Sequence, residues 1–191
     1  GKIPYIGIRQ AIMHAINTQE CVDYYQTTAE AIYRPMSKSS WAYPEGCTPY
    51  YPYIGAIIPE DLDVVNPAYK SYVEELEKQA GDTFSEEEQL EFLRRLVEGY
   101  YSSECGYSES KFRLNANGIY TDGQHTCKYT FTIAGQETDH PAWRAMNHAM
   151  EILNKVGFNV NVVTDANALS KLSSGALTVW AAAWGSTIDP D

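Results

Sequence analysis

The stretch "CKYTFTIAGQETDHPAWRAMNHAMEILNKVGFNVNVV", residues 127–163, decides the fold class of this chain. Its first nine residues alternate as a strand does, and its last six, rich in valine and asparagine, predict a second strand. Apolar residues at helical spacing lie between the two: Ala142, Met146, Ala149, Leu153 and Val156. With Gly157 after the last of them, this pattern predicts an amphipathic helix with a glycine at its end. Strand, helix and strand in this order form a right-handed crossover unit.

The segments after residue 163 extend this unit. "DANALSKLSSG", residues 165–175, predicts a short helix, and "ALTVWAAAW", residues 176–184, predicts a last strand. The expected fold is therefore α/β, a mixed β-sheet with helices packed on it, in which strands near 128–133, 159–163 and 178–183 lie side by side. Trp180 lies well inside the last strand, so we expect it in the core.

Helical patterns occupy four earlier segments: residues 6–16, 17–26, 66–80 and 85–100. Asn17 with Glu20, and Ser85 with Glu88, have the spacing of capping boxes. The one arginine of the first helix, Arg9, is expected to pair with a neighbouring acid. The Asp122-Gly123 pair, which follows an irregular polar segment, predicts a hairpin turn.

Composition narrows the classes of partner. A net charge of −11 over 191 residues argues against nucleic acid and anionic membranes, which both need a basic surface. No run of eighteen apolar residues is present, so no membrane-spanning helix is expected. The four cysteines form no CxxC pair, which leaves disulfides open but favours small buried thiols.

Catalytic motifs are missing from the sequence. It contains no GxSxG, no GxxxxGK[ST], no GxGxxG and no HExxH. His125, His140 and His148 are better explained by surface or capping roles than by metal ligation. We therefore expect a non-enzymatic protein with no catalytic residues, no metal and no cofactor.

Aromatic residues suggest where a ligand would bind. Residues 29–59 form a long loop with five prolines, in which Trp41 and Tyr43 either line a ligand path or anchor the loop. Arg34 in the same loop would meet a ligand carboxylate or form a structural salt bridge. Trp184 stands at the carboxyl end of the last strand, where open α/β sheets bind ligands. It is followed by the other expected ligand-binding residues: Gly185, Ser186 and Thr187.

The order of these segments resembles a known family. It runs from "IRQAIMHAINTQECVD" through "YRPMSKSSWAYPEG", "NPAYKSYVEELEKQAG", "YTFTIAG" and "AMEILNKVGFNVNVV" to "LSSGALTVWAAAWGSTIDPD". This order is similar to the extracellular solute-binding proteins of family 5, the oligopeptide/dipeptide-binding components of ABC importers. The similarity extends over nearly the whole chain and is most specific at its two ends.

The resemblance implies that residues 1–191 are the C-terminal ligand-binding lobe of a larger, two-lobed clamshell, with both ends near the hinge. It also implies the partners: a peptide or related small solute, a membrane permease and the missing N-terminal lobe. It places the protein outside the cytoplasm, as a cell-surface lipoprotein or a periplasmic protein. One departure concerns Thr187, which stands where peptide binders commonly have an aspartate for the peptide's amino terminus.

An alternative function belongs to a different class. A secreted glycan-binding or hydrolytic domain would also use an aromatic loop. A spatially assembled Asp/His/Glu triad in a pocket would favour the hydrolase. An open face lined by Trp41, Tyr43 and Trp184 would favour the importer lobe.

Overall fold

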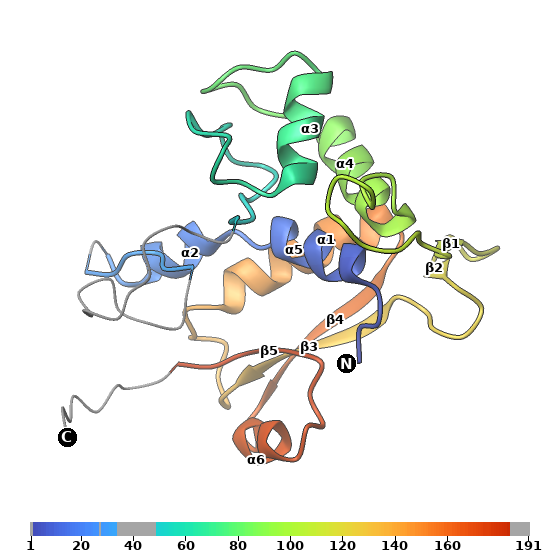
Figure 1. Cartoon of the computed structure of the whole chain (residues 1–191). Helices are drawn as coiled ribbons and strands as arrows, with labels where there is room; N and C mark the ends of the chain where they lie inside the picture. Colours follow the sequence, from blue (N-terminus) through green and yellow to red (C-terminus); the bar gives the residue numbers. More distant parts are fainter. Residues whose placement is uncertain (1, 27, 34–48, 184–191) are drawn as a thin grey trace, which may run out of the picture.

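The computed structural model describes residues 2–26, 28–33 and 49–183 (Figure 1). Helices make up the first half of this part of the chain, and the main sheet belongs to the second half. The elements follow in this order: α1 (Ile6–Ala15), α2 (Thr18–Tyr24), α3 (Pro67–Glu75), α4 (Glu86–Glu98), β1 (Arg113–Leu114), β2 (Tyr120–Thr121), β3 (Lys128–Ala134), α5 (Trp143–Val156), β4 (Asn159–Asp165), α6 (Ala168–Ser173) and β5 (Val179–Ala181).

Strands β3, β4 and β5 form one sheet, in the order β4-β3-β5. All pairings in it are parallel, and Phe131 of β3 lies opposite Val162 of β4 and Val179 of β5. Antiparallel pairing occurs in a separate ladder of β1 and β2. The predicted α/β class and the three neighbouring strands are confirmed, with parallel and antiparallel pairs divided between two sheets.

Helices α5 and α6 lie on opposite sides of this sheet (Figure 1). The chain moves from β3 to β4 through α5 and then returns past β3 to β5 through α6. Since crossovers between parallel strands are generally right-handed, a reversal of direction places the second helix on the other face, as Figure 1 shows. The face toward α5 carries the buried side chains of Phe131 and Ile133. The opposite face is more polar, and there Thr130 Oγ1 donates to Asn161 Oδ1 at 2.8 Å.

Helix α1 packs between α4 and α5. A close approach at Gly7 makes this packing possible, since a Cβ atom there would lie 2.0 Å from the carbonyl oxygen of Leu96. No side chain fits such a contact, so a glycine is required where α1 crosses α4.

The core is rich in aromatic residues and includes several fully buried rings from α3, α4, β2 and the segment after α4: Tyr69, Tyr72, Phe92, Tyr101 and Tyr120. His14 of α1 is fully buried among them, with its ring stacked on Tyr69 at 5.6 Å between centroids. Its Nδ1 donates to the carbonyl of Pro52 at 2.8 Å, and its own carbonyl accepts from Ile54 N at 2.8 Å. His14 therefore fixes the end of the long loop against α1.

Helix α2 ends at Tyr24, two residues before its predicted end, and α3 and α4 also end earlier than the sequence pattern indicated. Helix α3 ends at Glu75, and Glu77 then adopts a left-handed conformation with φ of 53°. Helix α4 ends at Glu98, and Gly99 after it reverses the backbone with a φ of 79°, so Tyr100 does not continue the helix and is exposed. In both cases the apolar spacing continued beyond the residue at which the backbone turns.

One of the two predicted capping boxes forms. Glu88 N donates to Ser85 Oγ at 3.2 Å, and Ser85 N donates to Glu88 Oε1 at 3.0 Å. Asn17 caps α2 by accepting from Gln19 N, but the carboxylate of Glu20 contacts His148 of α5 at 2.6 Å instead of the cap. The Asn17–Glu20 capping box was a wrong prediction, because a contact between α2 and α5 uses the glutamate.

Candidate functional site

The residues predicted to bind ligand lie outside the part of the chain that the structure describes. They are Trp41, Tyr43, Trp184, Gly185, Ser186 and Thr187, and Arg34 lies outside it too. Their roles stay predictions. The structure does describe the surface that leads to Trp184, because β5 and Ala183 come directly before it.

A groove of about 320 Å³ lies between α1 and β5, and we call it the α1–β5 groove. It forms because β5 is an edge strand of the main sheet, so its outer side faces α1 instead of another described strand. Its walls are largely apolar and come from α1, α5, β5 and the residues next to them: Ile3, Arg9, Ile12, Met13, Ile16, Met146, Thr178, Val179 and Trp180. Met13 and Trp180 are 47% and 40% exposed, so large apolar side chains here contact solvent.

A second hollow of about 420 Å³ adjoins this groove and shares Ile3, Arg9 and Thr178 with it. Lys2, Gly175 and Leu177 complete its lining. We call it the cationic end of the groove, because Lys2 and Arg9 both line it. The chain has 25 acidic residues, yet no Asp or Glu among the described residues lines either hollow. The two hollows therefore share one wall, and two positively charged side chains line the hollow at one end of the largely apolar groove.

Arg9 is held by backbone oxygens instead of the predicted acid. Its Nη1 donates to the carbonyl of Ile3 at 2.7 Å and lies 3.5 Å from that of Pro4. Lys2 Nζ donates to the carbonyl of Ala176 at 2.5 Å. Within the part of the chain that the structure describes neither cation forms an ion pair, so no described acid neutralises their positive charges in the groove.

Trp180 was expected in the core, and this prediction was wrong. Its register partner on β3 is Thr132, so it belongs to the polar face of the sheet and not to the face that α5 covers. On an edge strand that face is only partly covered, which leaves the indole 40% exposed. Its two neighbours on β5, Val179 and Ala181, do pack against the core.

The reversal of strand order at β3 places the crevice in which open α/β sheets bind ligands between the carboxyl ends of β3 and β5, the strand that leads to Trp184. On the other side of β3, at the carboxyl end of β4, Gly135 N donates to the carbonyl of Asp165 at 3.1 Å. The carboxylate of Asp165 pairs with Lys171 at 2.5 Å, and this hydrogen bond lowers the pKa of Asp165. Both polar groups of Asp165 are therefore already used by the protein.

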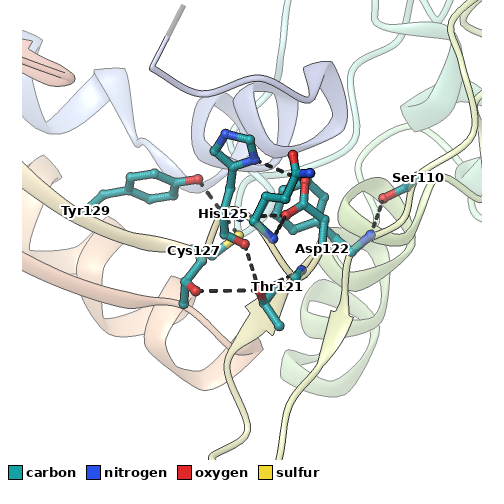
Figure 2. A network of polar contacts seen from close by, with 10 residues as sticks. Ser110, Thr121, Asp122, His125, Cys127 and Tyr129 are labelled. Carbon is teal, nitrogen blue, oxygen red and sulfur yellow. Dashed lines mark hydrogen bonds and ion pairs between the residues drawn. The ribbon is translucent and has the colours of Figure 1, made fainter.

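A polar network around the β2–β3 turn brings together Asp122, His125 and Thr121 (Figure 2). Asp122 accepts from His125 N at 2.6 Å and contacts the His125 ring at 3.1 Å, and these bonds lower its pKa to about 2. The Thr121 hydroxyl donates to the His125 carbonyl and not to its ring. No base activates a hydroxyl in this geometry, so the network is a hydrogen-bonded turn and not a nucleophilic triad.

The other candidate reactive groups have structural roles. His140 Nδ1 accepts from Ala142 N in the turn before α5, and this hydrogen bond gives it a local structural role. The described cysteines, Cys21, Cys105 and Cys127, are free thiols, and burial raises the pKa of Cys127 to about 12. Within residues 2–26, 28–33 and 49–183, no three metal-binding side chains cluster and no helix has the length and apolarity to cross a bilayer.

The sequence carries few local signals for the residues that line the α1–β5 groove. The apolar stripe of α1 predicted Ile12 as buried, but Met13, on the adjacent side of the helix, gave no signal of its own. Arg9 and Lys2 are separated from Thr178 by more than 160 residues, and no local pattern predicts that they meet. The available hint was a lysine just before α1 and an arginine within it, in a helix without acids in its first turn.

No protein-family model matches the sequence, and no curated protein matches it. The structure is similar to the oligopeptide-binding protein AppA from Bacillus subtilis, solved with a nonapeptide, at 15% identity and a TM-score of 0.47 over 86% of this chain. It is also similar to an oligopeptide-binding protein from Thermus thermophilus, solved with a pentapeptide, at 13% identity and a TM-score of 0.39 over 91% of this chain.

This chain spans 24% and 23% of the lengths of those two proteins. Both neighbours are binding proteins by their descriptions. At these identities and TM-scores the similarity does not establish a family, a ligand or an activity for this chain.

Proposed function

We propose that this chain is one ligand-binding lobe of the solute-binding component of an ABC importer, and that its solute is a peptide or a related small molecule. The observation that carries the proposal is the open α1–β5 groove, which runs beside the edge strand that leads to Trp184. The ordered sequence motifs at both ends of the chain, given above, support the same assignment.

The groove suits half of a binding site better than a complete one. Small-molecule sites bury most of their ligand, commonly about 70–90% of its surface. Met13 and Trp180 are 47% and 40% exposed, so a ligand on these side chains would keep one side in solvent. A second lobe that closes over this surface would supply the other wall, and hinge closure is the usual way in which two-lobed proteins enclose a ligand.

The mechanism requires binding and motion but no bond chemistry. The solute first contacts the open lobe, the second lobe closes over it, and the closed form is delivered to a membrane permease. This role places the protein outside the cytoplasm, at the cell surface or in a periplasm. The rival hydrolase has no support from the Asp122–His125 turn, because its threonine does not contact the imidazole.

The test is to purify the full-length protein that contains this chain and identify any solute that co-purifies, by mass spectrometry after denaturation. We expect short peptides, and we expect a peptide added back to the emptied protein to raise its melting temperature. A full-length protein that carries no solute and gains no stability from a peptide mixture would contradict the proposal. Release of cleaved peptide or glycan products would favour the hydrolytic alternative.

A further inference from the structure

The cationic end of the α1–β5 groove has a feature that peptide capture alone does not require. Arg9 uses Nη1 for the backbone carbonyls of Ile3 and Pro4. Its Nε and Nη2 groups form no hydrogen bond with any described residue, and the side chain is exposed. These two N–H groups lie on one edge of the planar guanidinium and match the two oxygens of a carboxylate.

The anchoring of both cations favours binding at this position. Arginine and lysine lose much side-chain entropy when they bind a ligand, and a side chain already held in place loses less. The carbonyl of Ile3 holds Arg9 at 2.7 Å, and the carbonyl of Ala176 holds Lys2 at 2.5 Å. Both residues line the same hollow, so two positive charges are fixed at one end of the groove.

We propose that Arg9 and Lys2 bind the terminal carboxylate of a peptide, and that the apolar part of the α1–β5 groove takes its last side chain. This inference rests on the proposed function and names its ligand class, peptides with a free carboxyl terminus and an apolar final residue. The groove fits such an end because Arg9 and Thr178 line both parts of it, while Met13, Met146 and Trp180 line only the apolar part.

The negative net charge of this chain opposes the binding of an anionic group. At −11, the chain attracts cations in general and repels anions. A peptide amide carries one more positive charge than the corresponding acid, so the overall field favours the amide. A preference for the acid would run against the field of this chain, and Arg9 and Lys2 are the cations that line the groove to supply it.

The test uses calorimetry on the full-length protein with three probes: the tripeptide Ala-Ala-Leu, its carboxyl-terminal amide and its N-acetylated form. We expect the free acid and the N-acetylated acid to bind about tenfold more tightly than the amide. Arg9→Gln should remove this preference, and Lys2→Gln should reduce it. Arg9→Lys should retain part of it, because the charge remains but the two-donor edge is lost.

Arg113→Gln is the matched control. Arg113 is also exposed and also donates to backbone carbonyls, those of Phe112 and Ser110, but it lies on β1 and lines neither part of the groove. This variant should keep the full preference for the acid. Melting curves of all variants identify any that fail to fold, and the acid–amide comparison on the unmodified protein needs no variant.

The outcomes separate the two proposals. Acid and amide that bind equally, or an acid preference that survives Arg9→Gln, would overturn the carboxylate site and leave peptide capture intact. A loss of preference in the Arg113→Gln control would also overturn it. If none of the three peptides binds, and no other peptide does, the proposed function fails and this inference fails with it.

Discussion

Replacement of His14 should change how the stability of this protein depends on pH. The imidazole is fully buried, and burial lowers its pKa from an ordinary value near 6.5 to about 4. The rings around it are Tyr51, Tyr69 and Phe92, which carry no charge at neutral pH. Its Nδ1 must carry the proton, since the Pro52 carbonyl at 2.8 Å can only accept, and Nε2 has no partner among the described residues.

The sign of the effect follows from proton binding in the two states. Above pH 6.5 the imidazole is neutral in both the folded and the unfolded chain, and His14 adds no pH dependence. As the pH falls from 6.5 toward 4, the unfolded chain takes up a proton and the folded chain does not, so stability falls. With about 1.4 kcal/mol for each pKa unit, the full loss is about 3 kcal/mol, of which about 2 kcal/mol falls between pH 7 and pH 5.

Urea unfolding followed by circular dichroism at pH 7, 6 and 5 measures this loss. His14→Gln keeps a donor for the Pro52 carbonyl but does not titrate. We expect it to cost about 1–3 kcal/mol at pH 7, from poorer packing among the rings, and to cost about 2 kcal/mol less at pH 5. His148→Gln, at a half-exposed position on α5, is the control, and its cost should not shrink in the same way. If His14→Gln costs the same at pH 7 and pH 5, His14 is not buried as a neutral group and the reasoning is wrong.

Four further predictions concern packing, capping and binding. Gly7→Ala should destabilise the fold by about 3 kcal/mol or more, because its Cβ would meet the Leu96 carbonyl oxygen at 2.0 Å, and an unchanged thermal midpoint would refute this contact. Ser85→Ala should cost about 1 kcal/mol in urea unfolding by removing the acceptor for Glu88 N, and a neutral result would argue against the capping box. In the full-length protein, Trp184→Ala should weaken solute binding by about 2 kcal/mol in calorimetry with little change in melting temperature, and unfolding or unchanged affinity would remove Trp184 from the site. The 191-residue chain alone should bind peptides weakly, and calorimetry that gives about micromolar affinity would mean that its site is complete without a second lobe.

Local sequence patterns predicted an element correctly where its structure depends on residues within the element itself. The stripe from Met146 to Val156 predicted α5, because a helix between a sheet and other helices must bury one face. Ser85 and Glu88 predicted their own capping box, since both partners lie within one turn. The strands predicted near 128–133 and 159–163 form as β3 (Lys128–Ala134) and β4 (Asn159–Asp165), because alternation and β-branched residues are local features.

Local patterns failed where a distant partner takes up a side chain. Glu20 has the right spacing for a cap, but His148 of α5 lies 2.6 Å away and binds its carboxylate instead. Arg9 was expected to pair with an acid, but the turn before α1 offers it two carbonyl oxygens. Trp180 was expected in the core, but its place on an edge strand depends on the order of strands, which no single segment encodes.

The sequence by itself therefore determined the α/β class, the three neighbouring strands and most helices of this protein, because the periodicity of buried residues reflects which face of each element is covered. Only the tertiary structure decided that β3 is central, that Gly7 lies against Leu96, and that Lys2, Arg9 and Thr178 line one groove. These facts depend on contacts between residues far apart in the chain. Such contacts are stabilised by packing and electrostatics between distant segments, and neither leaves a periodic pattern in the sequence of the segments involved.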